Sequence, residues 1–288
     1  MSAPAASPGR WAPYLLSAPA LALFAVLLVV PLATTVLLSF NSFTMMKGIE
    51  EVYSLRNYAE ILGDSYYHEV FLRTFRIAFL VTLLAMLLGA PEAYILYRMR
   101  QPWRGFFLLI VLGPLLISVV SRTLGWALLF GSTGLVNRAL ATFGIEPLQF
   151  MYSETGVVIG LTHVLVPFMV ISVWASLQRL DPQVENAAVS LGATTPTVLR
   201  RILLPQVMPG VLSGAIIVFA LAASAFATPA IIGGRRLQVA ATSAYDEFLN
   251  TLNWPLGASL ALILLLANLV IVVGSNRLVE KRYAEVFE

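Results

Sequence analysis

The chain has 288 residues, of which 59% are hydrophobic and only 11% are charged. Soluble domains carry about a quarter charged residues, so this composition predicts one membrane-embedded bundle and excludes a pair of soluble domains. The net charge of +3 is too small to indicate a nucleic-acid-binding surface, and the absence of cysteine excludes disulfides and thiolate metal sites.

Long apolar runs predict an all-α, polytopic membrane protein with six transmembrane helices. Residues 1–13, rich in Ala, Ser and Pro, are expected to be a disordered N-terminus. A single domain over residues 14–276 then contains six runs long enough to cross a bilayer, at about residues 14–40, 74–97, 106–130, 155–178, 211–232 and 255–275. The first run is too long for a cleaved signal peptide, so we interpret it as a retained helix. Residues 277–288 form a polar tail.

The distribution of basic residues predicts the orientation of the chain in the membrane. If both termini are cytoplasmic, the inner segments contain ten Lys and Arg residues and the outer segments contain seven. Because the inner loops are also mostly shorter, their density of basic residues is higher, as expected for cytoplasmic loops. Residues 1–13, the loop 179–210 and the tail 277–288 are therefore predicted to be cytoplasmic.

The polar loop 179–210 is predicted to form two short helices. Asp181-Pro182 is a helix-start signal, and Gly192 suits a left-handed cap at the end of the first helix. Between them lies one apolar stripe at helical spacing, formed by Val184, Ala187, Ala188 and Leu191. Thr195-Pro196 starts a second helix that meets Pro205. Because such short helices are marginal in water, the first is expected to pack against another molecule. An amphipathic turn lying on the lipid surface would show the same periodicity.

The spacing of residues in this loop resembles the EAA signature of permease subunits of ATP-binding-cassette (ABC) importers. In that family the segment is a coupling helix that docks in a groove of the ATPase subunit. The resemblance therefore implies a type I ABC importer permease fold. It also implies an ATPase-coupling role for Glu185, Ala187, Ala188, Leu191, Gly192, Ile202, Leu204 and Pro205. Asn186 departs from the signature, since many relatives carry Ala there, but it faces away from the apolar stripe.

Four further stretches resemble the spermidine/putrescine branch of these permeases: residues 122–126, 134–137, 160–168 and 226–234. The implied function is that of a bacterial inner-membrane subunit that forms the pathway for a polyamine. Importers of thiamine, iron or phosphonate share much of the pattern and stay open as alternatives. The implied partners are an ATPase dimer that binds ATP and Mg²⁺, an extracytoplasmic substrate-binding protein and a second permease subunit. In the polyamine branch that second permease is typically a non-identical sister chain.

No enzyme site is visible in the sequence. The chain lacks a phosphate-binding GxxxxGK[ST] loop, so ATP hydrolysis is assigned to a partner and no cofactor or metal is expected here. The segment Gly210–Gly214 has the wrong spacing for an intramembrane serine protease. An ion-coupled secondary transporter would be expected to carry paired acids within its spans, which this sequence lacks. A membrane scaffold is the remaining alternative.

Polar and aromatic residues inside the spans are candidates for the transport pathway, because burying a charge in lipid costs several kcal/mol. The pathway candidates are Arg122, Trp126, Trp174, Ser224, Phe226 and Thr228. Arg122 is equally well interpreted as an arginine that satisfies helix-end carbonyls or reaches the headgroups. Glu92 is expected to be a structural anchor paired with Arg98 or Arg100, and His163 a hydrogen-bonded packing residue.

Overall fold

The computed structural model describes residues 12–287, which are almost entirely helical. The helices are α1 (Ala12–Ser39), α2 (Arg56–Gly63), α3 (Ser65–Arg98), α4 (Trp103–Leu116), α5 (Val119–Phe130), α6 (Leu135–Thr142), α7 (Glu154–Leu177), α8 (Pro182–Ser190), α9 (Thr195–Val198), α10 (Leu204–Ala223), α11 (Ala240–Leu249) and α12 (Trp254–Phe287). Strands β1 (Ser42–Thr44) and β2 (Gly48–Glu50) form one antiparallel hairpin. Residues Leu199–Leu203 and Pro229–Gly233 are π-helical, and Gly234–Arg236 is a 3₁₀ turn.

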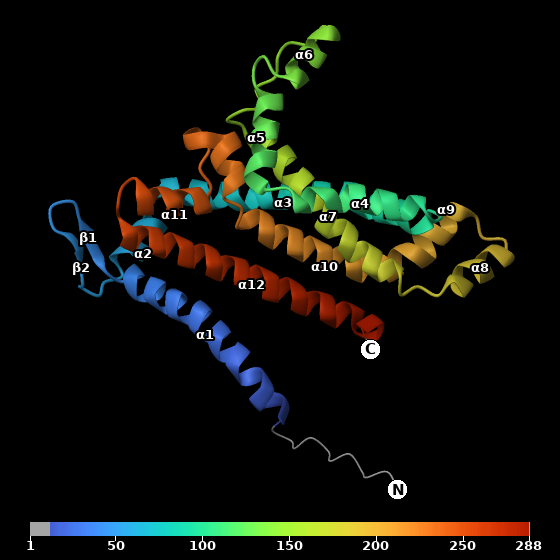
Figure 1. Cartoon of the computed structure of the whole chain (residues 1–288), viewed down its shortest axis with the longest axis horizontal. Helices are drawn as coiled ribbons and strands as arrows, with labels where there is room; N and C mark the ends of the chain where they lie inside the picture. The colour runs from blue at the N-terminus through green and yellow to red at the C-terminus, as the bar shows by residue number, and fades with distance from the viewer. Residues whose placement is uncertain (1–11, 288) are drawn as a thin grey trace.

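The long helices form an elongated bundle with α7 at its centre (Figure 1). Two thirds of the most apolar window of α7 is buried, because α3 and α10 pack along it. The approach of α10 is close: a Cβ atom on Gly210 would lie 2.6 Å from Ser176 Cβ and 2.9 Å from the carbonyl oxygen of Ser172. Lipid provides no hydrophobic drive for helix association, so small residues that allow such contacts stabilise the bundle through packing.

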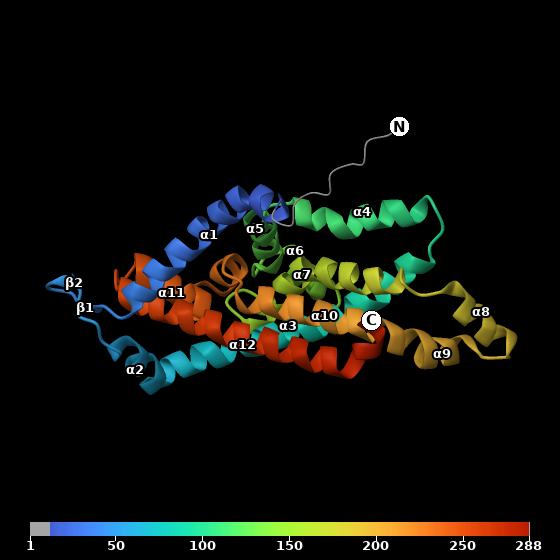
Figure 2. The same cartoon turned by 90° about the horizontal axis from the view of Figure 1, so that it is seen from below.

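The two ends of the bundle carry different elements. Strands β1 and β2 lie at one end, here called the hairpin end, and α8 lies at the other, here called the α8 end (Figure 1). At the hairpin end, the buried Asn57 side chain donates hydrogen bonds to Ser39 O (2.8 Å) and Asn41 O (2.9 Å), and Ser259 Oγ donates to Ser39 O (3.1 Å). These bonds join the last turn of α1 to α2 and α12. The end of α12 lies toward the α8 end (Figures 1 and 2).

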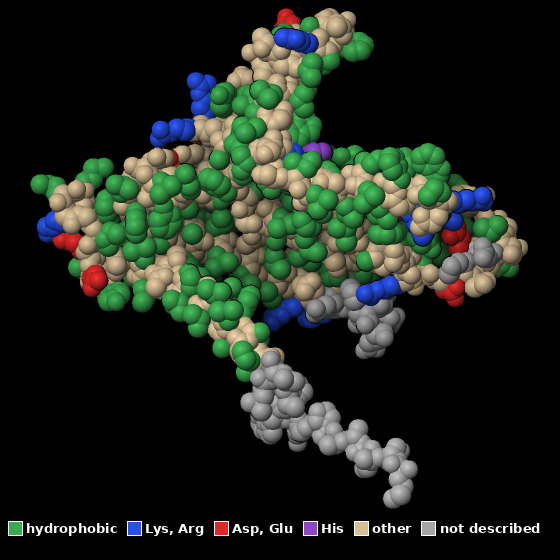
Figure 3. All heavy atoms as spheres, viewed as in Figure 1, with side chains coloured by type: hydrophobic (Ala, Val, Ile, Leu, Met, Phe, Trp, Pro, Cys, Tyr) green, Lys and Arg blue, Asp and Glu red, His purple; other side chains and the backbone are tan. Residues whose placement is uncertain are grey.

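The membrane-spanning character predicted from the composition is confirmed. The part of the chain that the structure describes contains six helical segments long and apolar enough to cross a membrane. Hydrophobic side chains cover most of the middle of the bundle in Figure 3, and most charged side chains lie toward its ends. The predicted disorder of residues 1–13 falls mainly on residues 1–11, which lie outside the described part, whereas Ala12 and Pro13 already belong to α1.

The expectation of one continuous third span at residues 106–130 is wrong. The chain bends at Ile117 and Ser118, whose ψ angles of 137° and 132° are extended, so α4 and α5 are separate helices. Pro114 lies in the last turn of α4, where it has no N–H to donate to the carbonyl four residues earlier, so this turn lacks one helical hydrogen bond. Helix α4 runs along α3 and α7, whereas α5 and α6 project away from the bundle (Figure 1).

Two further span boundaries differ from the prediction. The fifth helix begins before residue 211 and ends at Ala223, and the segment that follows changes to a π-helical turn at Pro229. The sixth helix does not end near residue 275 but continues to Phe287, so the predicted tail is helical wherever it is described.

Candidate functional site

Helix α8 forms where the local signals predicted it. The Asp181 side chain accepts a hydrogen bond from Gln183 N (2.9 Å), which caps the first turn. At the other end Gly192 has φ = +84°, and Ala193 N donates to Ala188 O (3.0 Å). A residue in this left-handed conformation is most easily a glycine, because a side chain there crowds its own backbone at a cost of roughly 1–2 kcal/mol. The start and the end of this helix are thus confirmed.

In the part of the chain that the structure describes, most of the apolar stripe of α8 is exposed, and Ala188 is half-buried. Val184 is 44% exposed and Leu191 is 90% exposed, and the Ala187 side chain is exposed as well. Helix α8 lies at the end of the bundle, beyond the ends of α3 and α7 (Figures 1 and 2). A short helix with an exposed apolar face is suited to dock into another protein, because docking removes that apolar area from water.

Glu185 connects α8 to the transmembrane bundle. Its carboxylate forms an ion pair with the guanidinium of Arg98, the last residue of α3. Arg98 Nε also donates to Tyr94 Oη (3.0 Å), which holds the arginine against its own helix. The expected pairing of Glu92 with Arg98 or Arg100 is therefore wrong, since among the described residues the carboxylate that Arg98 binds is Glu185. Eighty-seven residues separate the two partners, so no local pattern could have indicated the pair.

Ile202, Leu204 and Pro205 lie in a helix that continues into the membrane. The second short helix predicted to meet Pro205 does not stop there, because a π-helical turn at Leu199–Leu203 leads from α9 into α10. Proline has no N–H to donate to the carbonyl four residues earlier, and the wider turn before it places Pro205 in the first turn of α10. Helical structure therefore runs without interruption from Thr195 to Ala223.

The six pathway candidates lie in several places. Arg122 donates a hydrogen bond to Pro114 O at the end of α4, while Trp126 Nε1 donates to His163 Nδ1 (3.2 Å), confirming the hydrogen bond expected for His163. Three other candidates lie at the end of α10 or after it. Ser224 Oγ donates to Ala220 O (2.8 Å), and the centre of the Phe226 ring lies 4.7 Å from that of the Tyr245 ring. The hydroxyl groups of Thr228 and Thr123 are 3.1 Å apart. The sixth, Trp174, has a buried indole N–H without a hydrogen-bond partner among the described residues.

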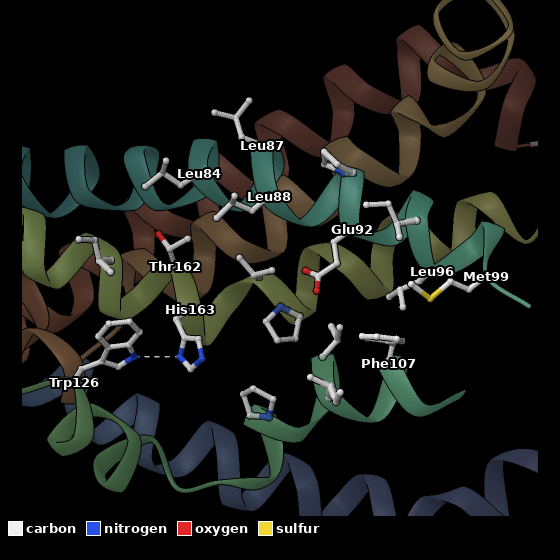
Figure 4. Close-up of a pocket in the computed structure, with 18 residues that line it drawn as sticks. Leu84, Leu87, Leu88, Glu92, Leu96, Met99, Phe107, Trp126, Thr162 and His163 are labelled. Carbon is white, nitrogen blue, oxygen red and sulfur yellow. Dashed lines mark hydrogen bonds between the residues drawn. The ribbon is translucent and has the colours of Figure 1, made fainter. Parts of the chain in front are cut away.

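A cavity of about 860 Å³ lies between α3, α4, α5 and α7. Its lining is largely aliphatic and aromatic, and Trp126 is the one pathway candidate in it. Figure 4 shows the Glu92 carboxylate pointing from α3 into this space. Glu92 was expected to form a local ion pair because it lies near the arginines in the chain, and its orientation toward the cavity was not predicted.

Comparison with known proteins identifies the family and the fold. Residues 98–285 match the family described as binding-protein-dependent transport system inner membrane component. The chain is 30% identical over 243 residues to the spermidine/putrescine transport system permease protein PotB of Salmonella typhimurium, covering 83% of this chain and 84% of that protein. It is 31% identical over 194 residues to the molybdenum transport system permease protein ModB of Mycobacterium bovis, covering 67% and 72%.

Solved structures agree with this assignment. A chain of a bacterial ABC transporter that imports the acidic polysaccharide alginate superposes with a TM-score of 0.79 at 18% identity, covering 94% of this chain and 96% of that chain. A second structure of a bacterial alginate ABC transporter, in complex with a pentasaccharide-bound periplasmic protein, also gives 0.79, at 19% identity and 94% coverage of both chains. At these identities the likeness establishes the fold.

Proposed function

The chain belongs to the binding-protein-dependent transport system inner membrane components and is a permease subunit of an ABC importer with the type I fold, and we propose that its substrate is a polyamine such as spermidine or putrescine. In this proposal the chain forms part of the substrate pathway in the bacterial inner membrane, with both termini and α8 in the cytoplasm. A second permease subunit, two ATPase subunits and a periplasmic binding protein complete the transporter.

The exposed face of α8 is the observation that carries the coupling mechanism. Val184, Ala187 and Leu191 offer an apolar surface to an ATPase subunit, and the Glu185–Arg98 ion pair attaches this helix to α3. When two ATPase subunits close around ATP, each moves the docked helix that it holds. The displacement reaches the spans through α3 and through the continuous helix from Thr195 to Ala223, which opens the pathway outward. ATP hydrolysis then returns it to the inward-facing state.

Two observations support a polyamine as the substrate. Spermidine/putrescine permeases are 30% identical to this chain over 81% to 83% of its length. In addition, the carboxylate of Glu92 faces the membrane cavity, where a cation would compensate its charge.

An oxyanion such as molybdate is the second candidate substrate, because a molybdenum permease is equally similar over a shorter part of the chain. The cavity disfavours an anion, because the charged residue among its lining residues is the carboxylate Glu92.

The test is the ATPase rate of the purified complex, reconstituted in liposomes with its binding protein, in the presence of different ligands. We expect spermidine or putrescine to stimulate ATP hydrolysis and molybdate to leave the basal rate unchanged. Stimulation by molybdate alone would refute the polyamine assignment and leave the importer mechanism intact. Uptake driven by an ion gradient in liposomes that contain this chain alone would refute the coupling mechanism.

A further inference from the structure

The cavity between α3, α4, α5 and α7 contains one carboxylate without a counter-ion. Glu92 has no ion-pair or hydrogen-bond partner among the residues that the structure describes. Arg98, one turn and a half further along α3, is held by Glu185 and Tyr94. A carboxylate within a membrane span is expected to have a cationic partner or to mark a functional site, because its burial in lipid is costly.

The other polar groups of the cavity do not neutralise Glu92. His163 Nδ1 accepts the hydrogen bond from Trp126 Nε1, so the imidazole in this arrangement is neutral and carries its proton on Nε2. Thr162, which lines the cavity, donates its hydroxyl proton to Val158 O (2.7 Å). Arg122 keeps its charge, since Pro114 O is a neutral acceptor, but it is not among the residues that line the cavity and it forms no ion pair with Glu92. Among the described residues that line the cavity, Glu92 is therefore a negative charge without a cationic partner, accompanied by a neutral imidazole and a hydroxyl group.

The walls on either side of Glu92 are apolar. Leu88 lies one helical turn before Glu92 on the same face of α3, and Phe107 of α4 lies across the cavity from it (Figure 4). The indole ring of Trp126 lies at the far end, beside His163 (Figure 4). Aliphatic walls accommodate methylene groups, and the face of an indole attracts an ammonium group.

We propose that this cavity binds an alkylammonium group, with Glu92 as the counter-ion and the apolar walls in contact with the attached methylene chain. The proposal rests on the proposed function, in which the transported solute is an aliphatic amine. One carboxylate compensates one ammonium group, so any further amines of a polyamine require Trp126 or groups outside this cavity. A lipid acyl chain would fit the walls equally well, but it would leave Glu92 without a partner.

The first experiment measures the electrostatic preference of the cavity without transport. The chain has no cysteine, so Leu88→Cys introduces a single thiol one turn from Glu92. In the assembled complex, its thiolate attacks a methanethiosulfonate reagent, forms a disulfide and releases methanesulfinate. The rates for trimethylammonium-ethyl and sulfonato-ethyl reagents are compared by mass spectrometry of this chain, with Glu92 intact and with Glu92→Gln. Phe107→Cys serves as a second reporter if the first variant is unstable.

We expect the ratio of cationic to anionic rates to fall on the order of tenfold when Glu92 becomes Gln, because one nearby negative charge is removed. An unchanged ratio overturns the proposal. A thiol that reacts only with an uncharged apolar reagent also overturns it, since the cavity is then filled by lipid.

The second experiment measures uptake of spermidine by the reconstituted complex. We expect Glu92→Gln to raise the KM about tenfold, Glu92→Asp to change it less than threefold, and exposed Glu146→Gln, the control for loss of one carboxylate, to leave it unchanged. A wild-type KM in Glu92→Gln overturns the proposal. If the wild-type complex transports no polyamine, the proposed substrate is wrong, and the ratio of labelling rates in the Leu88→Cys variant still decides whether Glu92 attracts alkylammonium groups.

Discussion

At the scale of single residues, the ion pair between Glu185 and Arg98 determines how α8 is attached to the membrane domain. Glu185 is 21% exposed and Arg98 is 43% exposed, so water screens the pair. Exposed pairs of this kind contribute only about 0.2–1 kcal/mol to stability. The pair therefore orients α8 rather than stabilising the fold.

We expect Glu185→Ala and Arg98→Ala each to leave the melting temperature nearly unchanged and to reduce ATP-dependent uptake severalfold. The double variant is expected to lose little more than either single variant, because both changes remove the same contact. Uptake and thermal unfolding of the four proteins in the cycle provide the measurement. Independent, multiplicative losses would show that Glu185 acts through a contact other than Arg98.

Gly192 is the second residue whose conformation matters for α8. At φ = +84° a proline cannot replace it, because the pyrrolidine ring fixes φ near about −65°. We expect Gly192→Pro to abolish uptake while the protein still inserts in the membrane. Nothing lies within 4 Å of a Cβ at this position, and asparagine tolerates the left-handed backbone conformation. We therefore expect Gly192→Asn to retain most of the uptake. Normal transport by Gly192→Pro would refute the coupling role of α8.

At the scale of elements, the close packing of α10 on α7 makes Gly210 a sensitive position. A methyl group there must displace Ser176 or the backbone of Ser172. We expect Gly210→Ala to destabilise the protein by about 1–3 kcal/mol, as overpacked cores do, and to lower its melting temperature in detergent. Gly113→Ala in α4 is the matched control, because its Cβ would meet nothing within 4 Å. Equal melting temperatures for the two variants would contradict this packing.

The helices were predictable from the sequence to the extent that their signals are local. The cap at Asp181 and the left-handed turn at Gly192 depend on adjacent residues and were found. The bend at Ile117 was missed because an apolar run does not reveal where a chain leaves the bundle. Continuation through Pro205 was missed because it depends on a π-helical turn. The ion-pair partner of Glu185 and the orientation of Glu92 depend on tertiary packing. The spacing of residues in the sequence does not predict such packing.

At the scale of the whole molecule, the hairpin end and the α8 end lie at opposite ends of the bundle (Figure 1). The proposed orientation places β1 and β2 in the periplasm and α8 in the cytoplasm. Met46 is 99% exposed at the hairpin and Leu191 is 90% exposed after α8. When this cysteine-free chain is expressed without its ATPase subunits, which would cover Leu191, we expect a membrane-impermeant maleimide to label Met46→Cys in intact cells and Leu191→Cys only after the inner membrane is opened. The reverse labelling pattern would show that the chain has the opposite orientation in the membrane.

The unbroken helix from Thr195 to Ala223 has a mechanical consequence. Its 29 residues span about 44 Å at 1.5 Å per residue. When the segment moves as one body, a tilt of about 5° at the α8 end moves the far end by about 4 Å. That far end leads directly to Phe226 and Thr228, where the Thr123–Thr228 hydroxyl pair joins α5 to the start of the second π-helical turn. A small angular stroke by the ATPase would therefore be large enough to separate side chains that are in contact at the opposite side of the membrane.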